Sequence, residues 1–198
     1  MRKFLSLPQE KQNRIVNAAM TLFGEVGYKK AYISEIASDA GISKALIFHY
    51  FGSKKGLYSY LVYYTGKIVM TEAQHERDTA NKDFFDRAIT TINFRLALKS
   101  RYPAMNSFIE SVYKEDEPEV EEDINRLKAI ATDMHSKVEL GINETALLKD
   151  GINPIHVVEL VEKYTEGIVY SYHTGSSIDE TIKEVGKCLG MLKRNLFK

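Results

Sequence analysis

The sequence predicts an all-α protein of about nine helices. Apolar residues recur at spacings of three and four in one segment after another, the pattern of helices that bury one face. Glycine, proline or serine stands at many of the segment ends, as helix caps require. The chain has 198 residues, of which 44% are hydrophobic and 27% charged, so it can bury a sizeable core. We expect an N-terminal domain at residues 1–52 and a C-terminal domain at residues 53–198.

The N-terminal domain is expected to hold three helices. Residues 8–24 predict the first, and Gly24 and Gly27 are expected to end it. Its core-facing stripe consists of Ile15, Ala18, Ala19, Leu22 and Phe23. Residues 33–40 and 43–51 predict the other two helices. The expected centre of the domain is Phe23, Ile36, Ile47 and Phe51.

A tight turn joins the second and third helices. Gly41 suits the left-handed conformation that ends a helix, and Ser43 suits the N-cap of the next one. The small Ala37 opposite Gly41 is expected to let the two helices approach closely. Two short helices crossing steeply at a glycine turn form a helix-turn-helix. The outward face of the second helix carries a cation, hydroxyls, an imidazole and an aromatic ring, which suits a DNA major groove.

Charge is unevenly distributed, although the formal net charge is zero. Residues 1–58 hold nine Lys or Arg and four Asp or Glu, which leaves eighteen and twenty-three for the remainder. A basic N-terminal quarter on an acidic body is what phosphate binding by one end of the protein would require.

A longer motif covers the turn and both of its flanks. It consists of Ile36-Ala37, Ala40-Gly41-Ile42-Ser43-Lys44, Phe48-His49-Tyr50-Phe51, Ser53-Lys54 and Leu57. With this motif, residues from about 10 to 60 resemble the tetracycline-repressor (TetR) family of bacterial transcriptional regulators. The resemblance implies a DNA-binding domain at residues 1–52 and a helical effector-binding and dimerisation domain after it.

The predicted DNA contacts come from the loop before the motif, the second motif helix and the start of the fourth helix. Lys54 and Lys55 lie in a first helical turn, where the helix dipole disfavours cations, and a phosphate there would explain them. The predicted contacts are Lys29, Lys30, Ser34, Ser43, Lys44, Ala45, Leu46, Phe48, His49, Tyr50, Lys54 and Lys55.

Three positions depart from the family pattern. Ala31-Tyr32 replaces the usual capping Thr or Ser, with Ser34 as the substitute. Ala45 replaces the usual glycine, and Phe48 replaces a tyrosine whose hydroxyl could bond a phosphate. These departures concern the individual contacts and leave the mode of binding unchanged.

The C-terminal domain is expected to begin with a long helix, capped by Ser53 and reaching to about residue 80. At 1.5 Å per residue it spans about 40 Å, so it can start beside DNA and end deep in the second domain. Its buried stripe is Leu57, Leu61, Tyr64 and Ile68. Further helices are expected at residues 82–99, 103–114, 118–140, 154–173 and 178–198, the last after a capping box of Ser177 and Glu180.

The acidic run from residue 115 to residue 123 lacks the glycine and the alternating oxygen ligands of a calcium loop. We therefore expect a solvated loop that leads into a helix near Pro118.

The last helix has two packing surfaces. Gly186 and Gly190, four residues apart, would let a second helix come close, whereas an a/d seam lies on another face. The seam consists of Ile178, Ile182, Val185, Leu189, Leu192 and Leu196. Both surfaces could be buried within one subunit, but the resemblance implies a homodimer, because family members pair through their two C-terminal helices. The predicted interface is Val169, Gly186, Leu189, Gly190 and Lys193.

Enzyme signatures are absent from the sequence. It contains no dinucleotide or phosphate-binding loop, no zinc-protease motif and no nucleophile elbow. The single cysteine, Cys188, is expected to be a small hydrophobe in a packed helix. We expect no enzyme activity, no cofactor and no metal site.

Compartment follows from the same features. Arg2 and Lys3 precede no apolar signal region, and no apolar run approaches eighteen residues. The missing apolar run favours no membrane association. One cysteine cannot form an internal disulfide, which favours a reducing cytoplasm.

Two hypotheses for the C-terminal domain remain. In the first, an effector pocket makes the protein a repressor that a small, largely apolar molecule releases from a pseudo-palindromic operator. In the second, the domain binds a protein partner or only dimerises. Mainly from the resemblance, the predicted pocket residues are Tyr64, Ile68, Phe94, Tyr102, Met105, Phe108, Tyr164 and Tyr172.

Overall fold

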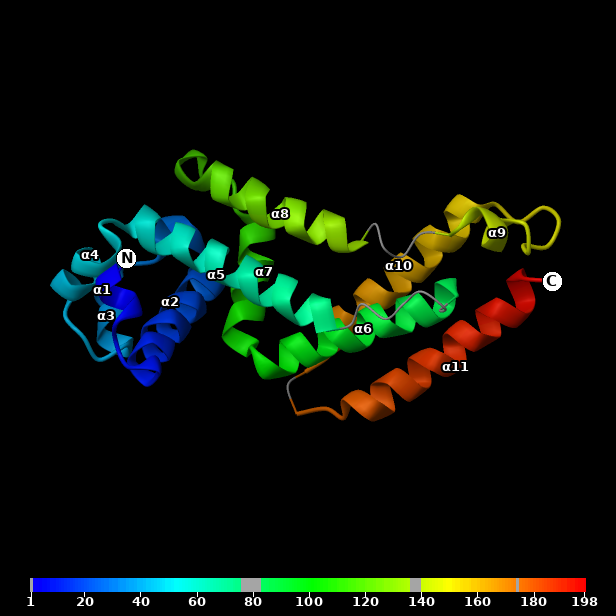
Figure 1. Cartoon of the computed structure of the whole chain (residues 1–198), viewed down its shortest axis with the longest axis horizontal. Coiled ribbons are helices and arrows are strands. Elements are labelled where there is room, and N and C mark those ends of the chain that lie inside the picture. The colour runs from blue at the N-terminus through cyan, green and yellow to red at the C-terminus, as the bar shows by residue number, and fades with distance from the viewer. Residues whose placement is uncertain (1, 76–82, 136–139, 174) are drawn as a thin grey trace. The chain divides into compact units, whose positions relative to one another are not determined.

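The computed structural model describes residues 2–75, 83–135, 140–173 and 175–198, apart from the side chains of residues 73–75, 131–135 and 142 (Figure 1). Within these ranges the fold is all-α, as predicted, with eleven α-helices and no strand. The helices are α1 (Arg2–Leu5), α2 (Gln9–Lys30), α3 (Ile33–Asp39), α4 (Lys44–Phe51), α5 (Lys54–His75), α6 (Phe84–Arg101), α7 (Pro103–Lys114), α8 (Glu121–His135), α9 (Ile142–Thr145), α10 (Pro154–Ser171) and α11 (Ile178–Leu196), with a 3-10 turn η1 (Pro118–Val120) before α8.

Two short helices, α1 and α9, raise the count above the expected nine. The other expected helices are present with ends shifted by a few residues. The expected extensions of the fourth helix to residue 80 and of the seventh to residue 140 fall partly outside the described residues.

The chain divides into two compact units. The first comprises Met1–Met70 and Tyr102–Thr132, and the second comprises Thr71–Arg101 and Asp133–Lys198. The first unit therefore holds α7 and the described side chains of α8 beside the N-terminal helices. Compactness alone does not assign roles, so the division at residue 52 into DNA-binding and effector-binding domains stays a prediction.

Helix α2 continues past Gly24 and breaks at Gly27, the second of the two glycines expected to end it. Gly24 lies against α7: a Cβ there would be 2.9 Å from the Ser107 backbone carbonyl carbon. Its role is close approach, which α2 and α7 need because they pack along each other. Gly27 breaks the helical geometry with φ 76° and ψ 173°, and one more turn follows. The expectation of a helix ending at residue 24 was wrong for this reason.

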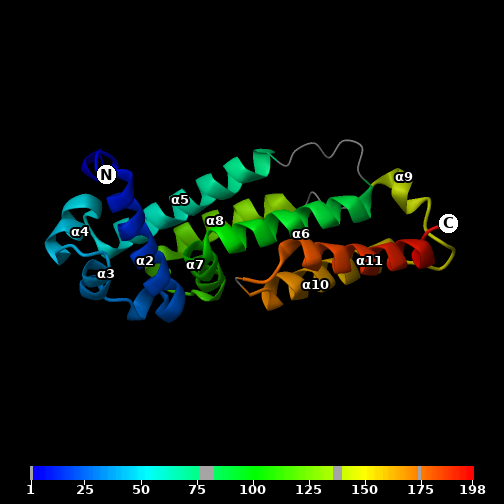
Figure 2. The same ribbon diagram turned by 90° about the horizontal axis from the view of Figure 1, so that it is seen from below.

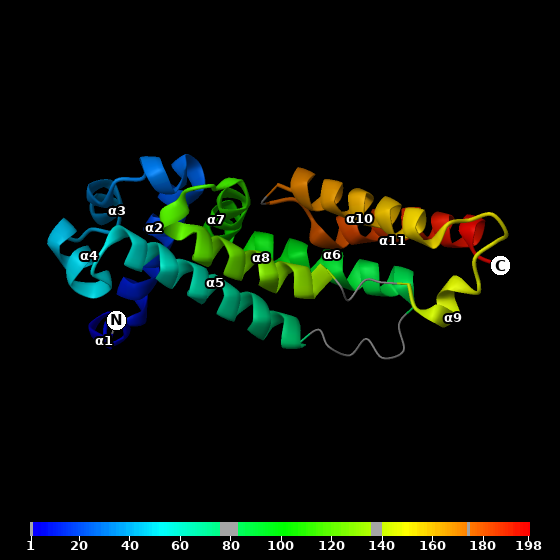
Figure 3. The same cartoon turned by 90° about the horizontal axis from the view of Figure 1, so that it is seen from above.

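The core of the first unit is largely aromatic. The ring of Tyr58 lies 5.1 Å from Phe23, 5.1 Å from Tyr28 and 5.2 Å from Phe108, all edge-on. The expected centre of the N-terminal domain is confirmed, since Phe23, Ile36, Ile47 and Phe51 are all buried. Helices α5 and α8 run side by side (Figure 3), and the Cβ that Gly66 lacks would lie 2.6 Å from Ile130.

The second unit is built on α6, α10 and α11, which lie along one another (Figure 2). The predicted seam of α11 faces its core: Val185 and Leu189 are buried and the other four members pack around them. Ser177 caps α11 by accepting the Glu180 N–H at 3.2 Å, as predicted. Helix α9 is held by Glu144, which pairs with Arg87 at 2.8 Å.

Candidate nucleic-acid interface

The turn between α3 and α4 is a complete Schellman motif. Gly41 has φ 65°, its N–H donates to the Ser38 carbonyl at 3.0 Å, and the Ile42 N–H donates to the Ala37 carbonyl at 2.9 Å. A Cβ on Gly41 would meet nothing within 4 Å. Glycine is therefore needed for its backbone conformation, and the expected close approach of the helices at Ala37 and Gly41 is not the reason for it.

Helix α4 begins at a serine cap and presents one polar face. Ser43 Oγ accepts the Leu46 N–H at 3.3 Å, and the inward side chains of α4 are buried in the core. Ser43, Lys44, Ala45, Phe48 and His49 are exposed, and Leu46 is half-buried. Lys44 Nζ stands 5.8 Å from the Phe48 ring centroid. The exposed side chains of the predicted reading face therefore lie on one helix, and their contact with bases stays a prediction.

Tyr50 lies apart from that face. It is 7% exposed, and its ring centroid lies 6.1 Å from that of Phe4. Its place in the core agrees with the apolar pattern of the helix. Because so little of its side chain is exposed, Tyr50 does not belong to the exposed face that could contact DNA.

The junction of α4 and α5 is fixed by two glycines and a serine. Gly52 ends α4 with φ 80°, and Ser53 Oγ accepts the Gly56 N–H at 2.9 Å, the predicted cap. A Cβ on Gly56 would lie 2.1 Å from the Phe51 carbonyl oxygen. Backbone packing therefore sets where α4 ends, and it leaves Lys55 exposed in the first turn of α5.

The surroundings of the end of α2 differ, because two of the predicted phosphate contacts there, Lys29 and Lys54, already have partners within the chain. Lys29 pairs with Glu117 at 3.0 Å, and this hydrogen bond raises the pKa of Lys29. Lys54 Nζ donates to the Lys29 carbonyl at 3.1 Å and stands 4.6 Å from the Tyr28 ring centroid. Burial lowers the pKa of Lys54. The other two predicted contacts nearby, Lys30 and Ser34, are exposed. Tyr32, at the N-cap position of α3, makes no side-chain capping hydrogen bond.

Residues 115–123, which we call the acidic connection, supply the partner of Lys29 and several further acceptors. Glu115 accepts the Tyr28 N–H at 2.6 Å, next to the break at Gly27. Burial, followed by a hydrogen bond to Glu119, raises the pKa of Tyr28. Asp123, 4% exposed, accepts from Ser59 Oγ at 2.5 Å. The expected helix start near Pro118 is confirmed, but the expectation of a merely solvated loop was wrong, because its carboxylates bind the end of α2 and α5.

Known proteins are similar to this part of the chain. The family model described as "Bacterial regulatory proteins, tetR family" matches residues 15–61. In this segment the chain is similar to the TetR family. The matched residues hold the helix-turn-helix, with the Schellman turn and the exposed face of α4 at its centre.

Among curated HTH-type transcriptional regulators, the chain is similar to BetI of Vibrio vulnificus (strain YJ016), with 40% identity over 53 residues, 27% of each chain. It is also similar to the uncharacterized regulator YerO of Bacillus subtilis (strain 168), with 38% identity over 74 residues, 37% of this chain and 26% of that one. The matches thus span about a quarter of these relatives.

Solved structures extend the likeness in fold to nearly the whole chain. A TetR family regulator from Chloroflexus aurantiacus has a TM-score of 0.71 at 16% identity, covering 100% of this chain and 98% of that one. FadR from Bacillus subtilis, in complex with stearoyl-CoA, has a TM-score of 0.61 at 16% identity, covering 89% and 96%. A regulator from Saccharomonospora viridis in complex with choline has 0.61 at 17%, covering 96% and 100%.

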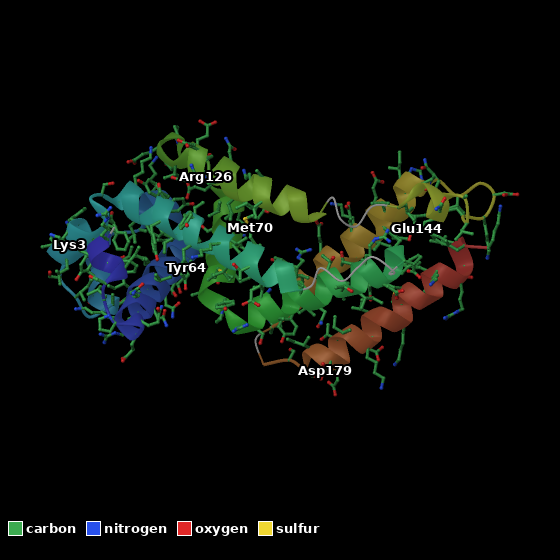
Figure 4. All side chains as sticks on the ribbon, in the orientation of Figure 1. Lys3, Tyr64, Met70, Arg126, Glu144 and Asp179 are labelled. Carbon is green, nitrogen blue, oxygen red and sulfur yellow. The ribbon has the colours of Figure 1, made fainter. Side chains whose placement is uncertain are left out.

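The predicted pocket residues fall into both units. The first unit holds Tyr64, Ile68, Tyr102, Met105 and Phe108, and the second holds Phe94, Tyr164 and Tyr172. Figure 4 labels Tyr64 on α5, where its ring stacks 5.9 Å from Tyr60. Phe108 is part of the aromatic core. The Tyr172 hydroxyl donates to the Ser176 carbonyl at 2.9 Å. Burial and a hydrogen bond with Cys188 raise the pKa of Tyr164 to about 12.

The predicted interface residues have two kinds of environment. Val169 and Leu189 are buried in the core of the second unit, and Lys193 pairs with Asp83. A Cβ on Gly186 would meet nothing within 4 Å, and one on Gly190 would meet only Arg194, at 3.5 Å. The two glycines thus keep an open face, and the dimer remains a prediction that rests on them.

Two further observations concern the described residues alone. Those residues contain no cluster of His, Cys, Asp or Glu that could hold a metal ion. None of the helices they form is both long and apolar enough to cross a membrane.

Proposed function

We propose that the protein is a homodimeric, sequence-specific DNA-binding regulator of transcription, a repressor that acts in the cytoplasm on a pseudo-palindromic operator. The observation that carries this proposal is the exposed face of α4, held between the Schellman turn at Gly41 and the packed junction at Gly56. A helix fixed at both ends can place its side chains on base edges, and a two-fold dimer would present two such helices about 34–36 Å apart or a multiple of that spacing.

The test begins by selecting the operator from a random-sequence DNA library with the full-length chain. Lys44→Ala/His49→Ala should weaken binding to the selected duplex by roughly 1–3 kcal/mol for each side chain that reads a base, with little change on unrelated DNA. Lys67→Ala, an exposed lysine further along α5, is the control for lost charge. Full affinity of the double variant for the selected duplex would remove α4 from the reading role.

We further propose that a small, largely apolar ligand lowers the affinity for the operator. Two buried hydroxyls on α5, those of Tyr58 and Thr65, have no hydrogen-bond partner among the described residues, and buried polar groups ordinarily have one. Two proteins of the same fold carry small molecules, stearoyl-CoA and choline. At 16–17% identity the likeness is in fold, so the ligand class proposed rests on the apolar and aromatic side chains of this chain.

The ligand hypothesis is tested by calorimetry with a panel of lipophilic molecules, on the protein with and without its operator. A true inducer must bind the operator complex more weakly than the free protein, by the same factor by which it weakens DNA binding. If every molecule binds neither form, or both equally, the alternative holds, in which the C-terminal domain binds a protein partner or only dimerises.

A further inference from the structure

Helix α1 lies outside the segment that matches the family model, yet it is built onto α4. Phe4 is fully buried. Its ring centroid lies 4.8 Å from that of Phe51 at the end of α4 and 5.2 Å from that of Tyr60 on α5. The three-ring cluster therefore fastens α1 to the end of the helix that carries the proposed reading face.

Hydrogen bonds fix the direction of α1 as well as its place. The Gln12 side-chain amide donates to the carbonyls of Leu5 at 3.2 Å and Leu7 at 2.8 Å. Ser6 Oγ donates to the Lys3 carbonyl at 2.9 Å. These bonds satisfy carbonyls at the C-terminal end of the helix, so α1 is an ordered part of the first unit.

Arg2 and Lys3 are exposed on this fixed helix. Figure 4 labels Lys3 on α1, at the end of the first unit that also carries α3 and α4. Within the described part of the chain, no carboxylate pairs with either side chain, in contrast to Lys29, which pairs with Glu117. Two cations thus lie beside α4 without an internal carboxylate to neutralise them, so their positive charge can attract a phosphate.

We propose that α1 is a second DNA-contacting element, whose Arg2 and Lys3 bind backbone phosphates next to the bases that α4 reads. This inference rests on the proposed DNA binding. Phosphate contacts set the register of a protein on the duplex and add affinity regardless of sequence. By this assignment α1 adds contacts that residues 15–61 alone do not supply.

The test is Arg2→Gln/Lys3→Gln in the full-length chain. Both side chains are exposed, so the core should be unaffected. Binding is measured from 50 to 300 mM salt on the operator duplex selected from the library and on a duplex of unrelated sequence. Removing two phosphate contacts should weaken binding to both duplexes by about tenfold and reduce the salt slope by about two for each protomer. Lys67→Gln/Lys198→Gln removes the same charge from elsewhere and should leave the slope unchanged.

The outcomes separate this proposal from the one it rests on. If the α1 variant keeps the wild-type affinity and slope while Lys44→Ala/His49→Ala loses the operator, α1 is no DNA contact and the proposed function stands. If the Lys67→Gln/Lys198→Gln control weakens binding as much as the α1 variant does, the loss is a general effect of charge and α1 is again no DNA contact. If the wild-type chain binds neither duplex, the proposed function itself fails.

Discussion

The two parts of the helix-turn-helix surface, the reading face of α4 and the end of α2, carry the same kinds of residue but are held by different forces. Helix α4 is positioned by backbone geometry at Gly41 and Gly56. The end of α2 is positioned by carboxylates of the acidic connection, through Glu115 and Glu117. Backbone packing is insensitive to salt, whereas an exposed ion pair is screened by it.

The two parts also differ in whether their lysines have partners within the chain. Lys55 is exposed after the junction of α4 and α5, and within the described residues no carboxylate pairs with it. Lys29 and Lys54, which the sequence offers as equal candidates, have an internal carboxylate and an internal carbonyl. We therefore expect Lys55 to be a better candidate for a phosphate contact than Lys29 or Lys54.

The largest effect on stability is expected from Gly56→Ala, which disrupts the backbone packing between α4 and α5. Its Cβ would overlap the Phe51 carbonyl oxygen, and overpacking costs roughly 1–3 kcal/mol. Chemical denaturation should show this loss at low and high salt alike. The control is Gly167→Ala on α10, where a Cβ meets nothing within 4 Å, so the better helix propensity of alanine should leave stability unchanged or raise it. A stable Gly56→Ala protein would mean that α4 is not held in this way.

A smaller loss is expected from Glu115→Ala at the end of α2. It leaves the Tyr28 N–H without its acceptor, and an unsatisfied, partly buried donor costs about 1–2 kcal/mol. Glu115→Gln keeps an oxygen acceptor and should recover much of that loss. Hydrogen exchange of the Tyr28 amide gives the local measurement, with faster exchange expected in the alanine variant only. If the Tyr28 amide of the alanine variant exchanges at the wild-type rate, Glu115 does not hold this turn.

The sequence was sufficient for nine of the eleven described helices and for the turn, because those features depend on local spacing. The fold class, the cap at Ser53 and the inward face of α11 all follow from patterns within a few residues. Gly24 shows where local reasoning fails: glycine usually ends a helix, but here it admits Ser107 from a helix more than eighty residues away. No local pattern distinguishes these two uses.

The same limit explains what the sequence missed at the candidate interface. Phe4 precedes the expected first helix, and its burial depends on Phe51 and Tyr60, which only the fold brings to it. The acidic connection appeared as a charged loop, since its partners at Tyr28 and Lys29 lie about ninety residues earlier in the chain. The carboxylates of Glu115, Glu117 and Glu119 were the available signal, although their charge and spacing alone identify no partner.

The smallest effect on stability is expected from Glu117→Gln. This change also tests directly whether the internal ion pair keeps Lys29 from DNA. This change frees Lys29, which is highly exposed, so the free energy of unfolding should hardly move. Affinity for DNA should rise about two- to fivefold at low salt, because a lysine becomes available and a negative charge near the phosphates is removed, and the gain should fade as salt screens it. Glu122→Gln is the matched control, since Glu122 pairs with Arg126 within α8 at 3.1 Å, and its loss frees no predicted contact. If Glu117→Gln and Glu122→Gln tighten DNA binding equally, the gain is a general effect of charge. If neither does, Lys29 lies outside the DNA interface, which then comprises the face of α4 and the cations left unpaired around it.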